Sequence, residues 1–348
     1  MHDYLTTKGY VVSDENAEET AKNVVARVLN GIEEPFPVEI DQVIAQSTFT
    51  PSIAIAKTWA GPQKRVFLAG DAAHQTVPSG GYGMNMGLVD AWDLSWRLAE
   101  SIRGRAGPNL LASYETERRP VAELMQHWGK IHGMKLLSLP RAVTLDPAVI
   151  NGTNEEGLEL RARIDEYIQK NDDHNQSTGV EMGYRYESSL CIEGPLDKSL
   201  PPPEFNNRQY TPTTYPGYRA PHVYLNDGSS IFDHYGTGFT LVDFANTTAP
   251  SLFEVAAKKN GLPLKVLHLT EEENARKVWG ADVVLLRPDG HVSWRGTGSV
   301  NEAEVSRVLL QANGHVVECV EDTNVHAKKT NSLAGEVNTK LEALKVGG

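Results

Sequence analysis

Hydrophobic and polar positions along the chain predict a mixed fold, with regular alternation of strands and helices in the carboxyl-terminal part. Apolar runs predict strands at residues 239–244 and 264–269. Two further runs, at residues 282–286 and 291–295, predict a hairpin because Pro288-Asp289-Gly290 between them is a strong turn sequence. Amphipathic spacing predicts helices at residues 251–260, 271–279 and 300–313. The expected order of elements is therefore βαβαββα.

The rest of the chain has a less regular pattern. Apolar residues at three-and-four spacing predict helices at residues 16–29, 107–140 and 155–170. Pro120 is expected to start or kink a helix within the second range, because proline lacks the backbone N–H that a helix interior needs. Short strands are expected at residues 36–44 and 49–56. The fold class expected for the whole chain is α/β in the broad sense, or α+β.

Residues 65–97 carry the most informative local pattern. The apolar run Val66-Phe67-Leu68-Ala69 predicts a strand buried on both faces, which Gly70 ends. Asp71 follows at the carboxyl end of that strand, where open α/β folds place groups that contact ligands. A helix with its amino end near Met84-Asn85 is expected next. Its apolar face consists of Leu88, Ala91, Trp92, Ser95, Leu98, Ala99 and Ile102.

The loop between this strand and this helix is rich in glycine. Gly80, Gly81, Gly83 and Gly87 lie within eight residues of one another in the sequence. Glycine lets backbone N–H groups approach a planar or anionic group closely, and a helix amino end adds partial positive charge. The segment therefore predicts a ligand site that combines a carboxylate, a glycine-rich backbone that a ligand can approach closely, and the partial positive charge of a helix amino end.

The residues of this segment carry a family resemblance. Residues 70–96 read GDAAHxxxPxxGxGMNxGxxDAxxLxW, which resembles the second flavin-binding motif of the FAD-dependent aromatic hydroxylases, the phenol 2-monooxygenase-like class A flavin monooxygenases. The similarity continues, in order, through YETERRP, MGYRY, PGYRAPH and LRPDG at residues 114–120, 182–186, 216–222 and 286–290. It covers most of the chain from about residue 43 to residue 320.

The resemblance implies FAD as the cofactor, with NADPH as a reductant where flavin is bound. The residues it assigns to FAD are Gly70, Asp71, Pro78, Gly81, Gly83, Met84 and Asn85. Asp71 would hold the ribityl hydroxyl groups, and the last four would lie against the isoalloxazine ring. One position departs from the pattern, because Asp93 stands where the family usually has an asparagine.

One feature of the family is missing from the sequence. The family begins with a βαβ unit whose GxGxxG fingerprint holds the FAD pyrophosphate at a helix amino end, and no GxGxxG occurs here. We therefore expect the chain to correspond to the family without its amino-terminal dinucleotide-binding half, and to bind FAD weakly or not at all by itself. Residues 1–200 would be a remnant of the FAD and substrate domain, residues 201–321 a further domain, and residues 322–348 a polar tail.

The order βαβαββα within residues 201–321 is that of a thioredoxin-like domain, which the resemblance also implies at this position. The sequence contains no CxxC, so we predict no thiol redox activity. Cys191 and Cys319 lack the spacing of a zinc site, as do His127 and His132, which are five residues apart. No metal site is expected.

Composition narrows the possible partners. The net charge of -12 and the absence of a basic stripe argue against a nucleic-acid surface. No apolar run is long enough to cross a bilayer, and the first residues have no secretory apolar core. We expect a cytoplasmic protein with no membrane or nucleic-acid partner.

Three functions remain open from the sequence. The first is FAD-dependent hydroxylation of a phenolic or polyketide-like aromatic, with the missing half supplied elsewhere. The second is a flavin-independent isomerase, cyclase or dehydratase, or a plain binding module, in which Asp71 and His74 would act as acid and base. The third is a structural partner that forms a homodimer or associates with a flavoprotein half.

Overall fold

The computed structural model describes residues 52–143 and 146–316, together with Glu19, Val25, Asp41, Gln42 and Ile44. The chain divides into two units, Met1–Ser52 and Ile53–Gly348, and the fold described below belongs to the second. The expected helix at residues 16–29, the strand at 36–44 and the tail at 322–348 lie outside the described residues, apart from isolated positions.

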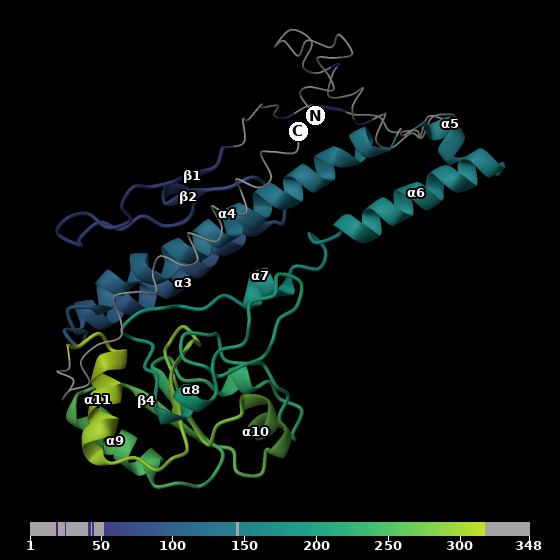
Figure 1. The fold of residues 1–348 in the computed structure, drawn as a ribbon. Helices are drawn as coiled ribbons and strands as arrows, with labels where there is room; N and C mark the ends of the chain where they lie inside the picture. The colour runs from purple at the N-terminus through teal and green to yellow at the C-terminus, as the bar shows by residue number, and fades with distance from the viewer. Residues whose placement is uncertain are drawn as a thin grey trace. The chain divides into compact units, whose positions relative to one another are not determined.

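The described elements begin with a small two-stranded sheet and two long helices (Figure 1). The first group is β1 (Ala54–Ile55), the 3-10 helix η2 (Gly70–Ala72), β2 (His74–Gln75), α3 (Tyr82–Ile102) and α4 (Leu110–Ala142). Shorter helices follow: α5 (Pro147–Ile150), α6 (Glu155–Asn171), α7 (Thr178–Met182), α8 (Pro195–Ser199) and the 3-10 helix η3 (Ile231–His234). The last group is β3 (Phe239–Asp243), α9 (Ala249–Lys259), β4 (Leu264–His268), α10 (Glu273–Trp279), β5 (Val283–Leu286), β6 (Val292–Gly296) and α11 (Glu302–Ala312).

The carboxyl-terminal domain has the expected order βαβαββα. Its four strands lie in the order β4-β3-β5-β6, with β3 and β4 parallel and the other pairs antiparallel. The hairpin turns at Gly290, whose φ of 80° suits glycine. The mixed α+β class and this element order are confirmed, whereas the domain boundary at residue 201 stays a prediction.

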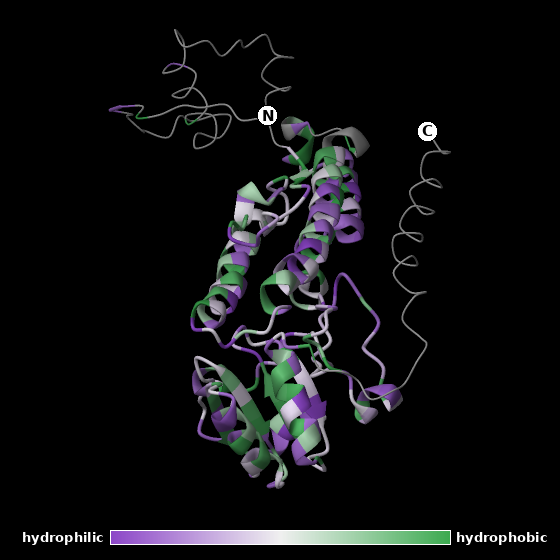
Figure 2. Ribbon diagram, turned by 90° about the vertical axis from the view of Figure 1, so that its left-hand side faces the viewer, coloured by the Kyte–Doolittle hydropathy of each residue, from purple (hydrophilic) through white to green (hydrophobic). Residues whose placement is uncertain are grey.

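Both faces of this sheet are apolar. Consecutive residues of a strand point to opposite sides of the sheet, and the inner strands have apolar residues on both sides. Leu241 and Leu285 pack on the side covered by α9 and α11, where Phe253 is fully buried. Val242 and Val284 pack on the other side, against Trp279 of α10. The strands in this domain are therefore coloured mainly as hydrophobic in Figure 2.

The long helices α3 and α4 lie side by side (Figure 1). The second helix confirms the expected helical region at residues 107–140. Pro120 does not start a helix, because α4 continues through that residue without interruption. The neighbouring residues are held by tertiary contacts: Arg118 binds Asp90 of α3, and Tyr114 donates to the carbonyl of Leu68. Such contacts compensate for the single hydrogen bond that proline removes.

The start and the inward face of α3 differ from the sequence prediction. The helix begins at Tyr82, so Gly83, Met84 and Asn85 form its first turn. The apolar positions expected to be buried include Leu88 and Trp92, each 62% exposed. The buried face instead consists of Tyr82, Met86, Asp90, Asp93, Trp96, Arg97 and Glu100. The helix thus turns its charged stripe inward.

The strand expected at residues 66–69 is also wrong. Its backbone makes only an isolated antiparallel bridge between Phe67 and Ala60, and Val66 is 67% exposed. Within the described residues no second strand lies beside this run, so a ladder of hydrogen bonds cannot form. Of the strand expected at residues 49–56, only Ala54–Ile55 is a described strand.

Candidate functional site

Residues 70–72 form a short 3-10 turn that packs on the first turns of α3. Gly70 has φ 56°, a conformation that favours glycine. A Cβ placed on Gly87 of α3 would lie 3.3 Å from the Cα of Gly70, so the two backbones approach closely. Asp71 is exposed, and its carboxylate is available to accept hydrogen bonds from a ligand.

The amino end of α3 lies next to this turn and carries no side-chain cap. Gly81 occupies the cap position with φ 69°, and a Cβ built there would meet nothing within 4 Å. Asn85 donates from its side chain to the carbonyl of Gly81 at 2.8 Å, which fixes the turn. The first N–H groups of a helix have no partner within the helix, so they offer donors and partial positive charge. Met84 is 75% exposed beside them.

Asp90 anchors the loop from behind. It accepts from the backbone N–H of Gly70 at 3.0 Å, from Nε2 of His74 at 2.6 Å and from Nε of Arg118 at 2.8 Å. Burial alone would raise the pKa of Asp90, but the hydrogen bond from His74 and the charge of Arg118 outweigh it and lower that pKa. Asp90 is therefore a carboxylate that positions Gly70, and with it Asp71, against α3.

Asp71 and His74, the acid and base suggested by the sequence, do not form a pair in the structure. His74 is 1% exposed and is hydrogen-bonded to Asp90, whereas Asp71 is exposed. The antiparallel pairing of β2 with β1 turns His74 inward, where its ring contacts Trp59. The proposed roles of the two residues stay predictions, but His74 has no access to a ligand beside Asp71.

A second buried charge network joins the two long helices to the carboxyl-terminal domain. Glu117 of α4 accepts from Nη1 and Nη2 of Arg287 at 2.7 and 2.9 Å, and it also pairs with Arg97 of α3. Arg97 is held by Asp93 through two hydrogen bonds of 3.0 and 3.1 Å. Asp289, in the hairpin turn, pairs with Arg287 and accepts from Nε1 of Trp96 at 3.2 Å.

This network contains more carboxylates than guanidinium groups. Asp93, Glu117 and Asp289 share Arg97 and Arg287, so one carboxyl has no full counter-charge. Burial raises the pKa of Asp93 to about 7, and the charge of Arg97 offsets this only in part. Burial opposes the ionisation of Glu117 too, but Arg287 and Arg97 lower its pKa to about 2. Asp93 is therefore the carboxyl group of this network that takes up a proton most readily.

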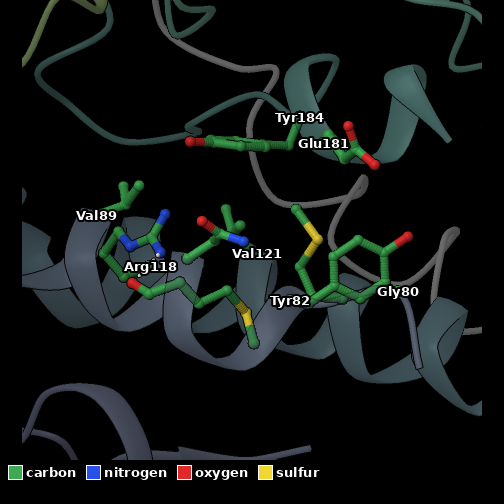
Figure 3. A pocket seen from close by; sticks show the side chains of 10 residues that line it. Gly80, Tyr82, Val89, Arg118, Val121, Glu181 and Tyr184 are labelled. Carbon is green, nitrogen blue, oxygen red and sulfur yellow. Dashed lines mark hydrogen bonds between the residues drawn. The ribbon is translucent and has the colours of Figure 1, made fainter. Parts of the chain in front are cut away.

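A cavity of about 350 Å³ opens between α3, α4 and the segment around α7 (Figure 3). The residues that line it are Gly80, Tyr82, Asn85, Met86, Val89, Arg118, Val121, Met125, Glu181 and Tyr184. Figure 3 shows the ring of Tyr184 facing the side chains of the two long helices across the cavity, with Glu181 beside it. The amino end of α3 thus borders both the exposed Asp71 loop and this cavity.

Stretches far apart in the sequence meet in these networks. Arg118 from YETERRP donates to Asp90 and to the hydroxyl of Tyr186 from MGYRY, and Arg287 from LRPDG lies 5.2 Å from the ring centroid of that tyrosine. Reasoning from the sequence missed Asp90, Arg118 and Arg287 as site-building residues. A signal was present, because Asp90, Asp93 and Arg97 also recur at three-and-four spacing.

The remaining candidate side chains, two histidines and a cysteine, have surroundings that suit a structural role. His132 is buried, with Nδ1 3.4 Å from the hydroxyl of Tyr82, and His127 is exposed. Burial raises the pKa of the Cys191 thiol to about 11. Within residues 52–143 and 146–316, no group of three His, Cys, Asp or Glu side chains is arranged to hold a metal ion. The helices of the described part are all too short or too polar to span a membrane.

Comparison with known proteins identifies the family. A family model described as FAD binding domain matches residues 4–128, and one described as aromatic-ring hydroxylase, C-terminal, matches residues 213–315. The chain belongs to the FAD-dependent aromatic hydroxylase family. It is 52% identical over 301 residues to the FAD-dependent monooxygenase opdD of Penicillium oxalicum, and 49% identical over 320 residues to the FAD-dependent monooxygenase apdD of Emericella nidulans.

These matches cover only part of the relatives. They span 85% and 90% of this chain but 57% and 51% of the two fungal proteins, so the chain spans about half the length of the curated relatives it matches. Among solved structures, the rebeccamycin biosynthetic enzyme RebC with reduced flavin is 32% identical, with a TM-score of 0.68 over 81% of this chain and 50% of that one. The flavin-dependent monooxygenase PieE in complex with FAD and substrate is 27% identical, with a TM-score of 0.65 over 76% and 50%.

The residues at the start of α3 fit part of FAD. The uncapped helix end and the open space at Gly81 suit the edge of a flat ring, and the exposed Asp71 suits hydroxyl groups of a ribityl chain. The sequence contains no GxGxxG, the motif that holds the pyrophosphate of a dinucleotide at a helix amino end. The described residues therefore fit the flavin end of the cofactor.

Proposed function

We propose that this chain belongs to an FAD-dependent monooxygenase that hydroxylates a phenolic or polyketide-like aromatic. In that enzyme it would form the part of the FAD site that contacts the isoalloxazine ring and the ribityl chain. The observation that carries the proposal is the juxtaposition of exposed Asp71 with the uncapped, glycine-lined amino end of α3. The names of the fungal and bacterial relatives, which include phenol 2-monooxygenase and aklavinone 12-hydroxylase RdmE, support the reaction class.

The binding site for the rest of FAD would be supplied by a dinucleotide-binding half outside this sequence, on the same or another polypeptide. The exposed apolar side of α3 supports this part of the proposal. Met84, Leu88, Trp92 and Ile102 are 75%, 62%, 62% and 84% exposed, although they have the spacing of a helix face that packs. A second half that covers this side would also bring its pyrophosphate site close to the amino end of α3.

The residues of this part of the FAD site would each have a definite role. Asp71 would accept hydrogen bonds from the ribityl hydroxyl groups, and the N–H groups of the first turn of α3 would stabilise negative charge on the ring edge. Asp90 would hold Gly70 against Gly87, so that Asp71 stays in place. Bound FAD, reduced by NADPH, would supply the activation of dioxygen.

Flavin titration of the purified chain tests this proposal. The chain alone should be colourless or substoichiometrically yellow, and FMN should compete nearly as well as FAD, because the distinguishing adenosine half has no partner. Co-expression with the amino-terminal half of the Penicillium relative should give a yellow complex that binds FAD stoichiometrically and consumes NADPH. The Asp71→Ala variant should lose this binding, whereas Asp165→Ala, at an exposed position of α6, should retain it.

Two outcomes would overturn the proposal. Stoichiometric FAD retained by the chain alone would show that no second half is required. Turnover of a substrate by the flavin-free chain, lost in Asp71→Ala, would instead establish the non-redox enzyme. The structure weakens that second function, because His74 is buried against Asp90 and cannot act beside Asp71 as its partner.

A further inference from the structure

Four buried side chains form a continuous row between the carboxyl-terminal domain and the turn that carries Asp71. Each is at most 3% exposed, and from the domain to the turn they are His291, Tyr186, Arg118 and Asp90. They belong to four different segments, which are the β5–β6 hairpin, the MGYRY stretch, α4 and α3. Every contact in the row therefore depends on the tertiary fold.

The first contact of the row is a stacked pair of rings. The ring centroids of His291 and Tyr186 are 4.2 Å apart, and the ring planes differ by 22°. The backbone beside them is joined as well, because the N–H of Tyr186 donates to the carbonyl of Gly217, whose own N–H donates to the carbonyl of Val292 in β6. A Cβ on Gly217 would clash with the carbonyl oxygen of Tyr186, so this approach requires glycine. Tyr186 is thus held by the carboxyl-terminal domain.

The second contact joins Tyr186 to α4. Its hydroxyl oxygen accepts from Nη1 of Arg118 at 3.2 Å, while Nε of Arg118 donates to Oδ1 of Asp90 at 2.8 Å. Nη2 reaches the carbonyl of Met86 only at 3.4 Å, the long end of the hydrogen-bonding range. The guanidinium is a rigid plane, so Tyr186 and Asp90 together fix its orientation. Without the tyrosine hydroxyl, Asp90 would be its only partner closer than 3.4 Å among the described residues.

The third contact passes this orientation on to the turn. Oδ1 of Asp90 accepts from Arg118, whereas Oδ2 accepts from the backbone N–H of Gly70 at 3.0 Å. Oδ2 also accepts from Nε2 of His74 at 2.6 Å. The two oxygens belong to one rigid carboxylate, so a rotation that followed Arg118 would draw Oδ2 away from Gly70. Because Gly70 directly precedes Asp71, the position of Asp71 depends on the orientation of Asp90.

The charge network around Glu117 joins the same parts of the molecule but does not extend to this turn. Glu117 pairs with Arg287 and Arg97, and among the described residues none of these three forms a hydrogen bond with residues 70–74. Arg287 instead lies against the ring of Tyr186, 5.2 Å from its centroid, which adds a second support from the carboxyl-terminal domain. Tyr186 is therefore the residue through which that domain reaches the turn.

We propose that the carboxyl-terminal domain positions the Asp71 turn through this row, with Tyr186 as the positioning residue that connects the two. The domain has no CxxC for thiol chemistry, and its docking onto α3 and α4 instead sets the position of the exposed Asp71 carboxylate. The contact of that carboxylate with the ribityl chain of a flavin rests on the proposed function. The dependence of the turn on the domain does not, because every member of the row belongs to this chain.

Hydrogen exchange of the Gly70 amide in the purified full chain tests this inference. Tyr186→Phe keeps the ring on His291 but removes the oxygen that accepts from Arg118, so the Gly70 amide should exchange about tenfold faster. Mass spectrometry with electron-transfer fragmentation resolves this amide, and the amides of β3 and β5 should keep the parent rate. Tyr235→Phe is the matched control and should leave the Gly70 rate unchanged, because the buried Tyr235 hydroxyl makes no hydrogen bond within the described residues. An unchanged Gly70 rate in Tyr186→Phe, or an equal increase in β3 and β5, would overturn the inference.

Variants of His291 test the contact with the domain itself. His291→Ala removes the stacked ring and should raise the Gly70 rate about as much as Tyr186→Phe does, whereas His291→Phe keeps a flat ring and should keep the parent rate. The double variant His291→Ala with Tyr186→Phe should exchange no faster than the faster single variant, because both changes release the same contact with Arg118. Multiplied effects in the double variant would show two independent routes and would refute the row.

Riboflavin titration of the same samples tests the functional step separately. Tyr186→Phe should weaken riboflavin binding by about threefold to tenfold, because the ligand must reorder the Asp71 turn as it binds. Faster Gly70 exchange in this variant, with no riboflavin binding by the parent chain, would support the positioning role and contradict the proposed function. Faster exchange with equal riboflavin affinity in the two proteins would also support the positioning role, and it would show that the flavin does not contact the turn.

Discussion

In the carboxyl-terminal domain, helices α9, α10 and α11 turn apolar side chains toward the sheet, whereas α3 turns charged side chains inward and apolar ones outward. In the carboxyl-terminal domain, Phe253 of α9 and Val305 of α11 are fully buried. In α3, by contrast, Asp93 and Arg97 are fully buried, while Leu88 and Trp92 are exposed. Apolar periodicity along a helix therefore indicates a surface that packs against something, but it does not identify the segment that packs there.

The two regions also differ in what stabilises their contacts. The sheet domain closes its own core, so its stability comes mainly from apolar burial. The contact between α3, α4 and that domain is instead built on Glu117, Arg287 and Asp289, whose charges must be paired because they are removed from water. A buried ion pair contributes little net stability compared with apolar residues, but breaking it is costly.

The largest effect should follow from removing one partner of that contact. Glu117→Ala leaves Arg287 and Arg97 buried with an uncompensated charge, so the free energy of unfolding should fall by about 3–5 kcal/mol. Urea denaturation followed by circular dichroism would measure it. Glu123→Ala, at an exposed position six residues further along α4, should change stability by no more than about 0.5 kcal/mol. A comparably small effect for Glu117→Ala would mean that apolar packing holds the domain to the helices.

The next effect depends on pH and on Asp93. Its pKa is about 7 in the folded chain and about 4 when unfolded, so between these values the folded chain binds the additional proton. Stability from this group is therefore complete below about pH 4 and falls by about 1.4 kcal/mol per pH unit as pH rises toward 7. Asp93→Asn carries a neutral amide that can still accept from Arg97, so it should become progressively more stable than the parent chain across this window.

Urea midpoints of the two proteins at a series of pH values would measure that difference. Histidines whose pKa is lowered by burial, such as His132 and His291, also make stability depend on pH, but they are common to both proteins and their contribution cancels. Asp165→Asn on α6 is the control, since it neutralises an exposed carboxyl that takes no part in the buried network. A constant difference for Asp93→Asn would show that Asp93 is ionised in the fold.

The sequence predicted the carboxyl-terminal domain well because its two apolar cores are formed mainly by residues of that domain. Neighbouring residues such as Leu241 and Val242 face the two cores on opposite sides of the sheet. Residues 66–69 failed as a strand for the opposite reason. A strand needs a neighbour for its backbone groups, and only the Phe67–Ala60 bridge is present among the described residues.

The candidate site was predicted in part. The Asp71 turn and the glycine-lined start of α3 were expected, and the structure brings them together. The supporting residues were not predicted, since Asp90, Arg118 and Arg287 come from three separate stretches and their pairing is a property of the tertiary fold. His74 is buried against Asp90 while Asp71 is exposed, because neighbours in a turn can point in opposite directions, and the catalytic roles of the two residues stay predictions.

The smallest effect on stability should come from the outward side of α3, and it separates packing within this chain from packing against a second half. Leu88→Lys replaces a side chain that is already 62% exposed, so the free energy of unfolding should change by no more than about 0.5 kcal/mol. The same variant should prevent assembly with the co-expressed amino-terminal half, because a lysine ammonium would be buried in an apolar contact without a partner.

Val255→Lys is the matched control in the other region, since Val255 of α9 is 66% exposed and lies on a domain that completes its own core. It should unfold like Leu88→Lys but assemble like the parent chain. Size-exclusion chromatography of the co-expressed pairs gives the readout. Normal assembly of Leu88→Lys would show that the second half binds elsewhere. A stability loss of several kcal/mol would show instead that Leu88 packs within this chain, and the contrast between α3 and the helices of the sheet domain would then disappear.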